Sequence, residues 1–252
     1  MSIDFAFAQA RVQARLGERL SATGWRALES TLGLPQYLAS VRNTSLARYV
    51  QHFSTNLTPH TIERSLRDDW RAEVEAVRHW VPESWSPAVA WTTWLPYLDA
   101  LAWLAGGGTV LPWMQADAVL SGVAARELAV GHATFGILPD DDTPAGWRAR
   151  WFDHWTSLYP KTRDEEKAGL RLLVAAVQRY FGTLERPGSS RTERREASER
   201  LEADAAGLVH RRAEAPVVVF CHLALVALDL QRLRDGLLRR ALFRDEAAEQ
   251  AA

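Results

Sequence analysis

Two groups of carboxylates are the residues of this sequence whose type and spacing come closest to a reaction centre. Asp68, Asp69 and Glu73 lie close together, and Asp69 and Glu73 are one helical turn apart. A second acidic run covers 140–142, where Asp140, Asp141 and Asp142 follow one another. Carboxylate oxygens are ligands for Mg²⁺. The two groups together would suit a helical, Mg²⁺-dependent enzyme that binds a diphosphate.

The neighbouring residues favour a simpler interpretation of these carboxylates. Asp68 and Asp69 alternate with Arg67 and Arg71, which is typical of a solvent-exposed helix face. The run DDDTP is typical of a turn that precedes a helix. We therefore expect surface carboxylates, and we predict no catalytic, cofactor-binding or metal-binding residue. The Mg²⁺-dependent diphosphate enzyme remains the alternative.

Other motifs of catalysis are absent. The sequence has no GxxxxGK, HExxH, GxSxG or GxGxxG pattern. The single cysteine, Cys221, lies in an apolar run, so we expect a buried thiol. The histidines are scattered without the ExxH spacing of metal-binding bundles. Four of them are expected to be ordinary helix residues: His79, His132, His154 and His222.

Composition indicates a globular protein with no nucleic-acid partner. The 252 residues are 47% hydrophobic and 24% charged, with a formal net charge of −1. Arginines are spread along the chain among acidic residues, so no basic stripe is formed. The N-terminus lacks a basic region followed by an apolar stretch, so we expect no secretory signal and a cytoplasmic location.

Helical periodicity dominates the chain. Between 58 and 81, apolar residues recur every three or four positions, with Thr58 as the expected N-cap and Pro59 at the first helical position. The opposite face is expected to be solvated. The apolar positions are Ile62, Leu66, Trp70, Val74, Val77 and Val81, and the polar ones are Glu63, Arg67, Arg71 and Glu75.

Three further helices are predicted towards the C-terminus. Capping-box spacing at Thr162 with Glu165, and at Ser190 with Glu193, predicts two helix starts. The second start opens the charged stretch RTERREASERLEAD, which indicates an exposed helix, with a linker as the alternative. The last helix is expected from Pro216. Its seam is Val219, Leu223, Val226, Leu230, Leu233 and Leu237, suited to packing along another helix such as the first one, 3–20.

The segment 84–116 is rich in tryptophan and carries one charge, Asp99. Prolines and the glycines 106–108 divide it into pieces too short for two membrane spans, so we expect no transmembrane helix. Core helices packed by large aromatics are the favoured interpretation. An apolar surface that docks on a partner or lies close to a membrane is the alternative.

These signals together predict an all-α protein, a compact multi-helix bundle forming one domain over 1–252. Helix junctions are expected near 139–144 and 186–190. Strand signals are almost absent, because VVVF at 217–220 continues into the helical seam and is therefore predicted as helix.

Several segments resemble the family of C-type subunits, also called d-type subunits, of V-type and A-type rotary ATPases. The opening FAFAQARVQARLGERL resembles the first helix of that family, and TGWRALESTLGLPQYLASVRNT continues the likeness. TIERSLRDDW matches an apolar-Glu-x-x-Leu-Arg pattern at Ile62, Glu63, Leu66 and Arg67. PVVVFCHLALVALDLQRLRDGLLRR resembles the closing helix, where Asp229 replaces a usual Glu and is followed by Leu233 and Arg234.

The resemblance implies a non-catalytic, all-helical protein with a funnel-like arrangement of short helices. Proteins of this family link the central stalk to the membrane rotor ring in proton or ion transport. This chain would then lie at the cytoplasmic face of the inner membrane without a span of its own. Typical members are longer, with three similar helical units, whereas this chain has room for about two. A free-standing helical adaptor is a further alternative.

Overall fold

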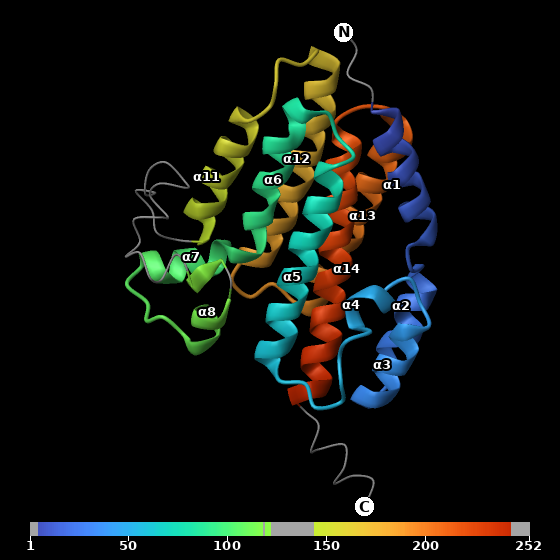
Figure 1. The fold of residues 1–252 in the computed structure, drawn as a ribbon, viewed down its shortest axis with the longest axis vertical. Helices are drawn as coiled ribbons and strands as arrows, with labels where there is room; N and C mark the ends of the chain where they lie inside the picture. Colours follow the sequence, from blue (N-terminus) through green and yellow to red (C-terminus); the bar gives the residue numbers. More distant parts are fainter. Residues whose placement is uncertain (1–4, 118, 122–143, 243–252) are drawn as a thin grey trace, which may run out of the picture. The chain divides into compact units, whose positions relative to one another are not determined.

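The computed structural model describes residues 5–117, 119–121 and 144–242, and every regular element among them is a helix (Figure 1). The predicted all-α class is therefore confirmed. The chain divides into two compact units. The first unit comprises Met1–Pro82 and Thr162–Ala252, and the second comprises Glu83–Lys161.

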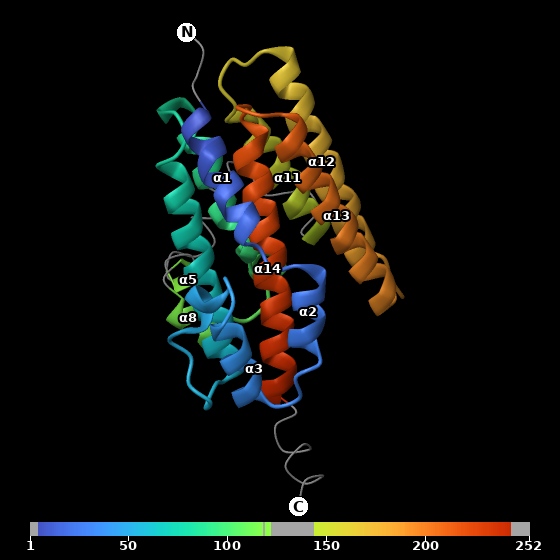
Figure 2. The same cartoon turned by 90° about the vertical axis from the view of Figure 1, so that its right-hand side faces the viewer.

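The first unit is built around its last helix. Its elements are α1 (Ala6–Glu18), α2 (Ala22–Glu29), α3 (Leu34–Arg42), α4 (Ala47–Val50), α5 (Pro59–Arg78), α12 (Asp164–Glu185), α13 (Arg191–Arg211) and α14 (Val217–Leu242). Helix α14 packs against α1, α3, α5, α12 and α13 (Figure 2). Every residue from Val217 to Leu223 is buried, as expected of a helix surrounded by others. The predicted seam of this helix is buried throughout, and its expected packing against the first helix is confirmed.

Helix α5 begins as its sequence predicts. The Thr58 hydroxyl accepts a hydrogen bond from the Thr61 amide at 3.2 Å, and Pro59 occupies the first turn. The apolar seam from Ile62 to Val77 is buried, but the helix ends at Arg78, so Val81 lies beyond it. The expectation of a solvated opposite face is wrong at Arg67, whose side chain is buried, while Glu75 is exposed.

The two predicted capping boxes had different outcomes. Ser190 and Glu193 form one at the start of α13, so RTERREASERLEAD is helix and not a linker. The prediction at Thr162 is wrong by one residue. Helix α12 begins at Asp164, and the Glu166 carboxylate accepts from the Arg163 amide at 3.2 Å.

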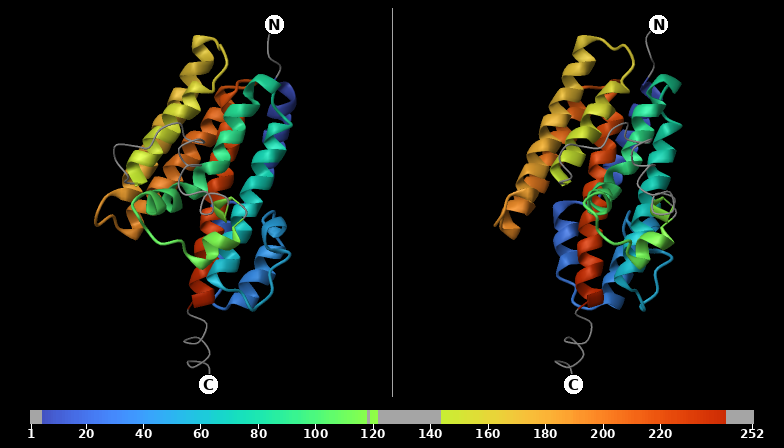
Figure 3. Two further views of the ribbon diagram at one scale, coloured as in Figure 1. Left: turned by 60° about the vertical axis from the view of Figure 1, so that its left-hand side comes forward. Right: turned by 90° about the vertical axis from the view of Figure 1, so that its left-hand side faces the viewer.

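Helices α12 and α13 lie side by side and pack along α14 (Figure 3). Their shared core is small, formed by Ala176, Tyr180, Ala197, Leu201 and Leu228. The junction expected near 186–190 is the turn between them. The junction expected near 139–144 falls mainly outside the described residues, and α11 of the second unit begins at Pro144.

Arg240 joins the end of α14 to the end of α2. Its guanidinium donates to the backbone carbonyls of Glu29, at 3.1 Å, and Thr31, at 2.9 Å, and it lies over the Tyr37 ring. The last carbonyls of a helix have no partner within the helix. A single arginine therefore satisfies the end of α2 and holds α2 and α3 against the central helix.

The second unit has a tryptophan core. Its elements are η1 (Glu83–Trp85), α6 (Ser86–Trp91), η2 (Thr92–Tyr97), α7 (Leu98–Ala105), α8 (Pro112–Ala116) and α11 (Pro144–Ser157). The indole N–H of Trp91 donates to the Trp151 carbonyl at 3.1 Å, and that of Trp151 donates to the Trp91 carbonyl at 3.3 Å. Trp155 donates to the Ala88 carbonyl at 3.0 Å. The favoured interpretation of the tryptophan-rich segment as helix core is therefore confirmed for its buried residues.

Among the described helices, none is both long enough and apolar enough to cross a membrane.

Candidate functional site

Polar side chains of the first unit gather along α14 and the helices that touch it. They form two groups, which are named here for their central residues. The histidine cluster consists of Arg48, Tyr49, Asp69, Glu73 and His222. The arginine clamp consists of Arg19, Glu202, Asp229 and Arg232.

The histidine cluster is centred on a buried pair. His222 Nε2 lies 2.9 Å from Glu73 Oε1, and the two residues are 3% and 7% exposed. The other carboxylate oxygen of Glu73 is 3.8 Å from the Arg48 guanidinium, which also donates to the Tyr49 hydroxyl at 2.7 Å. The Trp80 ring lies 5.4 Å from the His222 ring. Glu73 thus connects α5 to both α4 and α14.

Two carboxylates of this cluster have pKa values shifted in opposite directions. Burial acts to raise the pKa of Glu73, but the hydrogen bond and charge of His222, together with Arg48, bring it below its ordinary value. Burial, with the neighbouring Asp68 charge, raises the pKa of Asp69 to about 7 despite Arg48. Opposite shifts of this kind occur both at proton-transfer sites and in structural ion-pair networks. The Glu73 carboxylate is committed to His222 and Arg48, which favours the structural role.

Only the first of the two carboxylate groups of the metal-enzyme alternative lies among the described residues. Asp68 is exposed and pairs with Arg71 on its own helix. The expectation that Glu73 is a surface residue is wrong, because it is buried against His222. Asp140, Asp141 and Asp142 lie outside the described residues. Within the part of the chain that is described, no three His, Cys, Asp or Glu residues are placed to hold a metal ion together.

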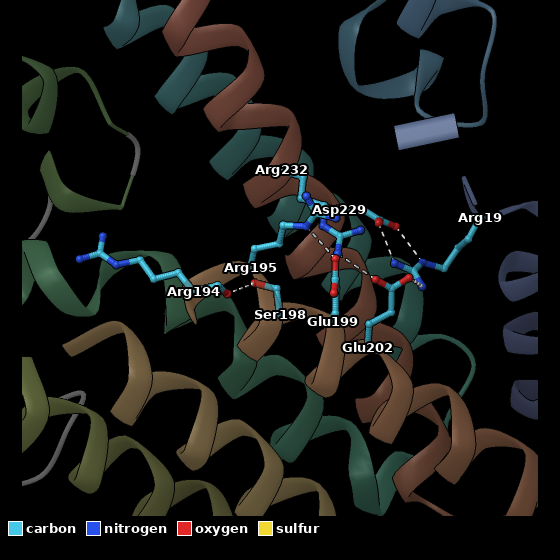
Figure 4. Close-up of polar contacts among 8 residues, drawn as sticks. All are labelled: Arg19, Arg194, Arg195, Ser198, Glu199, Glu202, Asp229 and Arg232. Atoms are coloured by element: carbon cyan, nitrogen blue, oxygen red, sulfur yellow. Dashed lines mark hydrogen bonds and ion pairs between the residues drawn. The ribbon is translucent and has the colours of Figure 1, made fainter. Parts of the chain in front are cut away.

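The arginine clamp joins three helices. Arg19, which follows α1, donates twice to the Asp229 carboxylate, at 2.9 and 2.7 Å, and once to Glu202 at 3.0 Å (Figure 4). Arg232 pairs with the second oxygen of Glu202 at 3.0 Å. Arg19 is 13% exposed and Asp229 8% exposed in their side chains. Two-point recognition of this kind fixes both distance and orientation.

A third contact joins α5 to α14 close to the C-terminal end of the latter. Arg234 Nε donates to Glu63 Oε1 at 2.6 Å, and Arg67 lies 3.6 Å from the other oxygen of Glu63. Arg67 and Glu63 are one helical turn apart, so the buried Arg67 has a charged partner on its own helix. Helix α14, through Arg234, thus contacts a face of α5 that the sequence predicts to be solvated.

The sequence predicts the long helices of the first unit but not these partnerships. Arg19 and Asp229 are 210 residues apart, and Glu73 and His222 are 149 apart. One signal was present in the sequence: Asp229 and His222 are polar residues inside an otherwise apolar stretch of the last helix. Buried charges need partners, so the two positions could have been marked, although their partners could not.

No protein-family model matches the chain, and neither the curated proteins nor the solved structures include a significant match.

Replacing Arg19 with Ala should destabilise the first unit by about 3–5 kcal/mol, because Asp229 would stay buried without its partner. Urea denaturation followed by far-UV circular dichroism measures the loss. Arg26→Ala is the matched control: Arg26 is exposed and bonds only within its own helix, so its loss should cost less than about 0.5 kcal/mol. The double variant Arg19→Met with Asp229→Leu should recover most of the stability. Equal losses for Arg19→Ala and Arg26→Ala would contradict the clamp.

Asp69 should make the protein less stable as the pH rises. Its pKa of about 7 in the folded state lies above the ordinary 3.8, so the proton it holds stabilises the fold. The free energy of unfolding should therefore fall between about pH 4 and about pH 7. Asp69→Asn should remove this fall in the free energy of unfolding. Asp68→Asn should retain the fall but move it to slightly lower pH, because the Asp68 charge helps to raise the pKa of Asp69. Denaturant titrations across this range test the effect, and an unchanged slope in Asp69→Asn would exclude it.

Proposed function

We propose that this protein is a non-catalytic subunit of a V-type or A-type rotary ATPase, where it links the central stalk to the membrane rotor ring in ion transport. It would act at the cytoplasmic face of the inner membrane by binding other subunits. The observation that carries the proposal is the packing of the segments that resemble the C-type family. All of them belong to the first unit.

The contacts between these segments involve residues of the resemblance itself. Glu63 of the α5 motif pairs with Arg234 of the closing helix, and Asp229 of the closing helix pairs with Arg19 of the opening segment. Helix α3, from the second resembling segment, also packs on α14. Independent pattern matches on unrelated helices would have no reason to meet as charge pairs. Charge pairs thus join the segments that carry the resemblance, and this is the observation that supports the proposal.

The chemistry of the first unit suits a binding scaffold. The arginine clamp and the histidine cluster connect helices to one another, which favours a rigid body that can transmit force. Helix α13 presents an outer face of exposed charges of both signs, including the pairs Arg195 with Glu199 at 2.8 Å and Glu196 with Arg200 at 3.0 Å. A helix face whose charges cancel in this way is compatible with a polar partner such as a coiled-coil stalk.

A tagged copy of the full chain, expressed in its own host, should co-purify ring and stalk subunits from gently solubilised membranes. The measurement is identification of the retained proteins and their amounts relative to the bait. An unrelated helical protein with the same tag is the control. Recovery of neither ring nor stalk from a host that expresses both would contradict the proposal, and recovery of a different single partner in their place would support a free-standing adaptor.

Mg²⁺ with diphosphate should leave the melting temperature of the protein unchanged. A ligand at about 100 times its Kd stabilises the folded state by about 2.7 kcal/mol, which raises the melting temperature of a chain of this size by about 5–10 °C. A diphosphate-binding enzyme should show that rise in melting temperature. The rise should disappear in the double variant Asp69→Asn with Glu73→Gln. A rise of this size in the unaltered protein would favour the enzyme over the ATPase role.

A further inference from the structure

The second unit has an exposed apolar loop with no charged side chain. Trp103 is 50% exposed, Val110 38% and Leu111 36%. They belong to the segment 103–113, called here the tryptophan loop, which comprises the last residues of α7, the connection 106–111 and the first residues of α8. No residue from 100 to 116 is Asp, Glu, Lys or Arg. The surface that this loop offers is therefore apolar and electrically neutral.

The acidic residues that border this stretch are engaged within the unit. Asp99 pairs with Arg148 at 2.9 Å. Asp117 is 1% exposed, and its Oδ1 accepts from the amides of Val119, at 2.9 Å, and Leu120, at 3.1 Å. Asp117 is thus buried, and the charge of Asp99, whose side chain is 78% exposed, is balanced by Arg148.

The exposed tryptophan is held in place by its own loop. The Trp103 indole N–H donates to the Thr109 carbonyl at 2.9 Å, and the Gly108 amide donates to the Trp103 carbonyl at 2.9 Å. Gly107 has φ +79°, and a Cβ on Gly108 would lie 2.4 Å from the Trp103 ring. Glycine is therefore required at both positions. The indole keeps its polar atom satisfied while half of its surface faces outwards.

We propose that the tryptophan loop inserts into the boundary between headgroups and acyl chains of a lipid membrane. Tryptophan is enriched at this depth, and its N–H is already satisfied here, so it needs no acceptor from the lipid. The absence of basic residues in the loop predicts that binding does not require anionic lipids. The inference goes beyond the proposed function, because a protein that links ring and stalk can bind both without touching lipid.

The size of the surface favours lipid over a protein partner. A stable protein–protein interface covers about 800 Å² on each partner and has a polar rim. Three partly exposed side chains cover on the order of a few hundred Å². A membrane requires no shape complementarity, and burial of apolar area alone gives reversible binding.

The full-length protein should co-float with phosphatidylcholine vesicles in a density gradient. The bound fraction should be the same when phosphatidylglycerol is added and when the salt concentration is raised, because no loop charge is available to be screened. Absence of binding to phosphatidylcholine vesicles would overturn the proposal. Binding that appears only with phosphatidylglycerol at low salt would overturn it as well.

Variants locate the contact. Val110→Ser with Leu111→Ser removes apolar area without touching the bonds that hold Trp103, and it should lower vesicle binding about tenfold. Trp103→Ser should lower it at least as much. Leu32→Ser is the matched control, since Leu32 is an 88% exposed leucine of the first unit, and its loss should leave binding unchanged. Equal binding by all variants would overturn the assignment to this loop.

Light scattering on the purified protein tests whether a second copy of the chain, in place of lipid, covers the tryptophan loop. A monomer is expected for the wild type and for Val110→Ser with Leu111→Ser. A wild-type dimer that becomes monomeric in this double variant would show that a second copy covers the loop and would overturn the lipid assignment.

Discussion

The buried carboxylate of Asp229 is the constraint around which the first unit is arranged. It lies on the central helix α14 and is almost inaccessible to water, so it needs a partner of opposite charge. Arg19 provides two hydrogen bonds to it and a third to Glu202. This arrangement ties the end of α1 and the side of α13 to the same point of α14. The positions of three helices thus depend on Arg19 and the two carboxylates that it contacts.

Other polar contacts along α14 also tie it to neighbouring helices. His222 binds Glu73 near its beginning, Arg234 binds Glu63 further along, and Arg240 satisfies carbonyls at the end of α2. Apolar packing supplies the driving force for burial, but it is not directional. Charged hydrogen bonds are directional, so they specify which neighbour lies at each level. Helix α14 is held in this way to its neighbours at several levels along its length.

Tryptophan has two different structural roles in the second unit. The two roles differ in the group to which the indole N–H donates its hydrogen bond. In the core, the indoles of Trp91, Trp151 and Trp155 donate to backbone carbonyls of neighbouring helices and so join those helices. In the tryptophan loop, Trp103 donates within its own loop. The first role explains how an uncharged segment forms a core. The second role leaves half of the Trp103 side chain exposed as part of an apolar surface.

The sequence by itself determined the long helices of the first unit, because caps, prolines and apolar periodicity act over one or two turns. Thr58 with Pro59, Ser190 with Glu193 and the seam of α14 are all of this kind. Tertiary structure alone decided which polar residues are buried. Arg67 and Glu73 read as surface residues, since charge and spacing cannot show that another helix covers them. His222, which binds Glu73, and Arg234, which binds the Glu63 partner of Arg67, come from a helix remote in sequence, and local patterns do not encode such contacts.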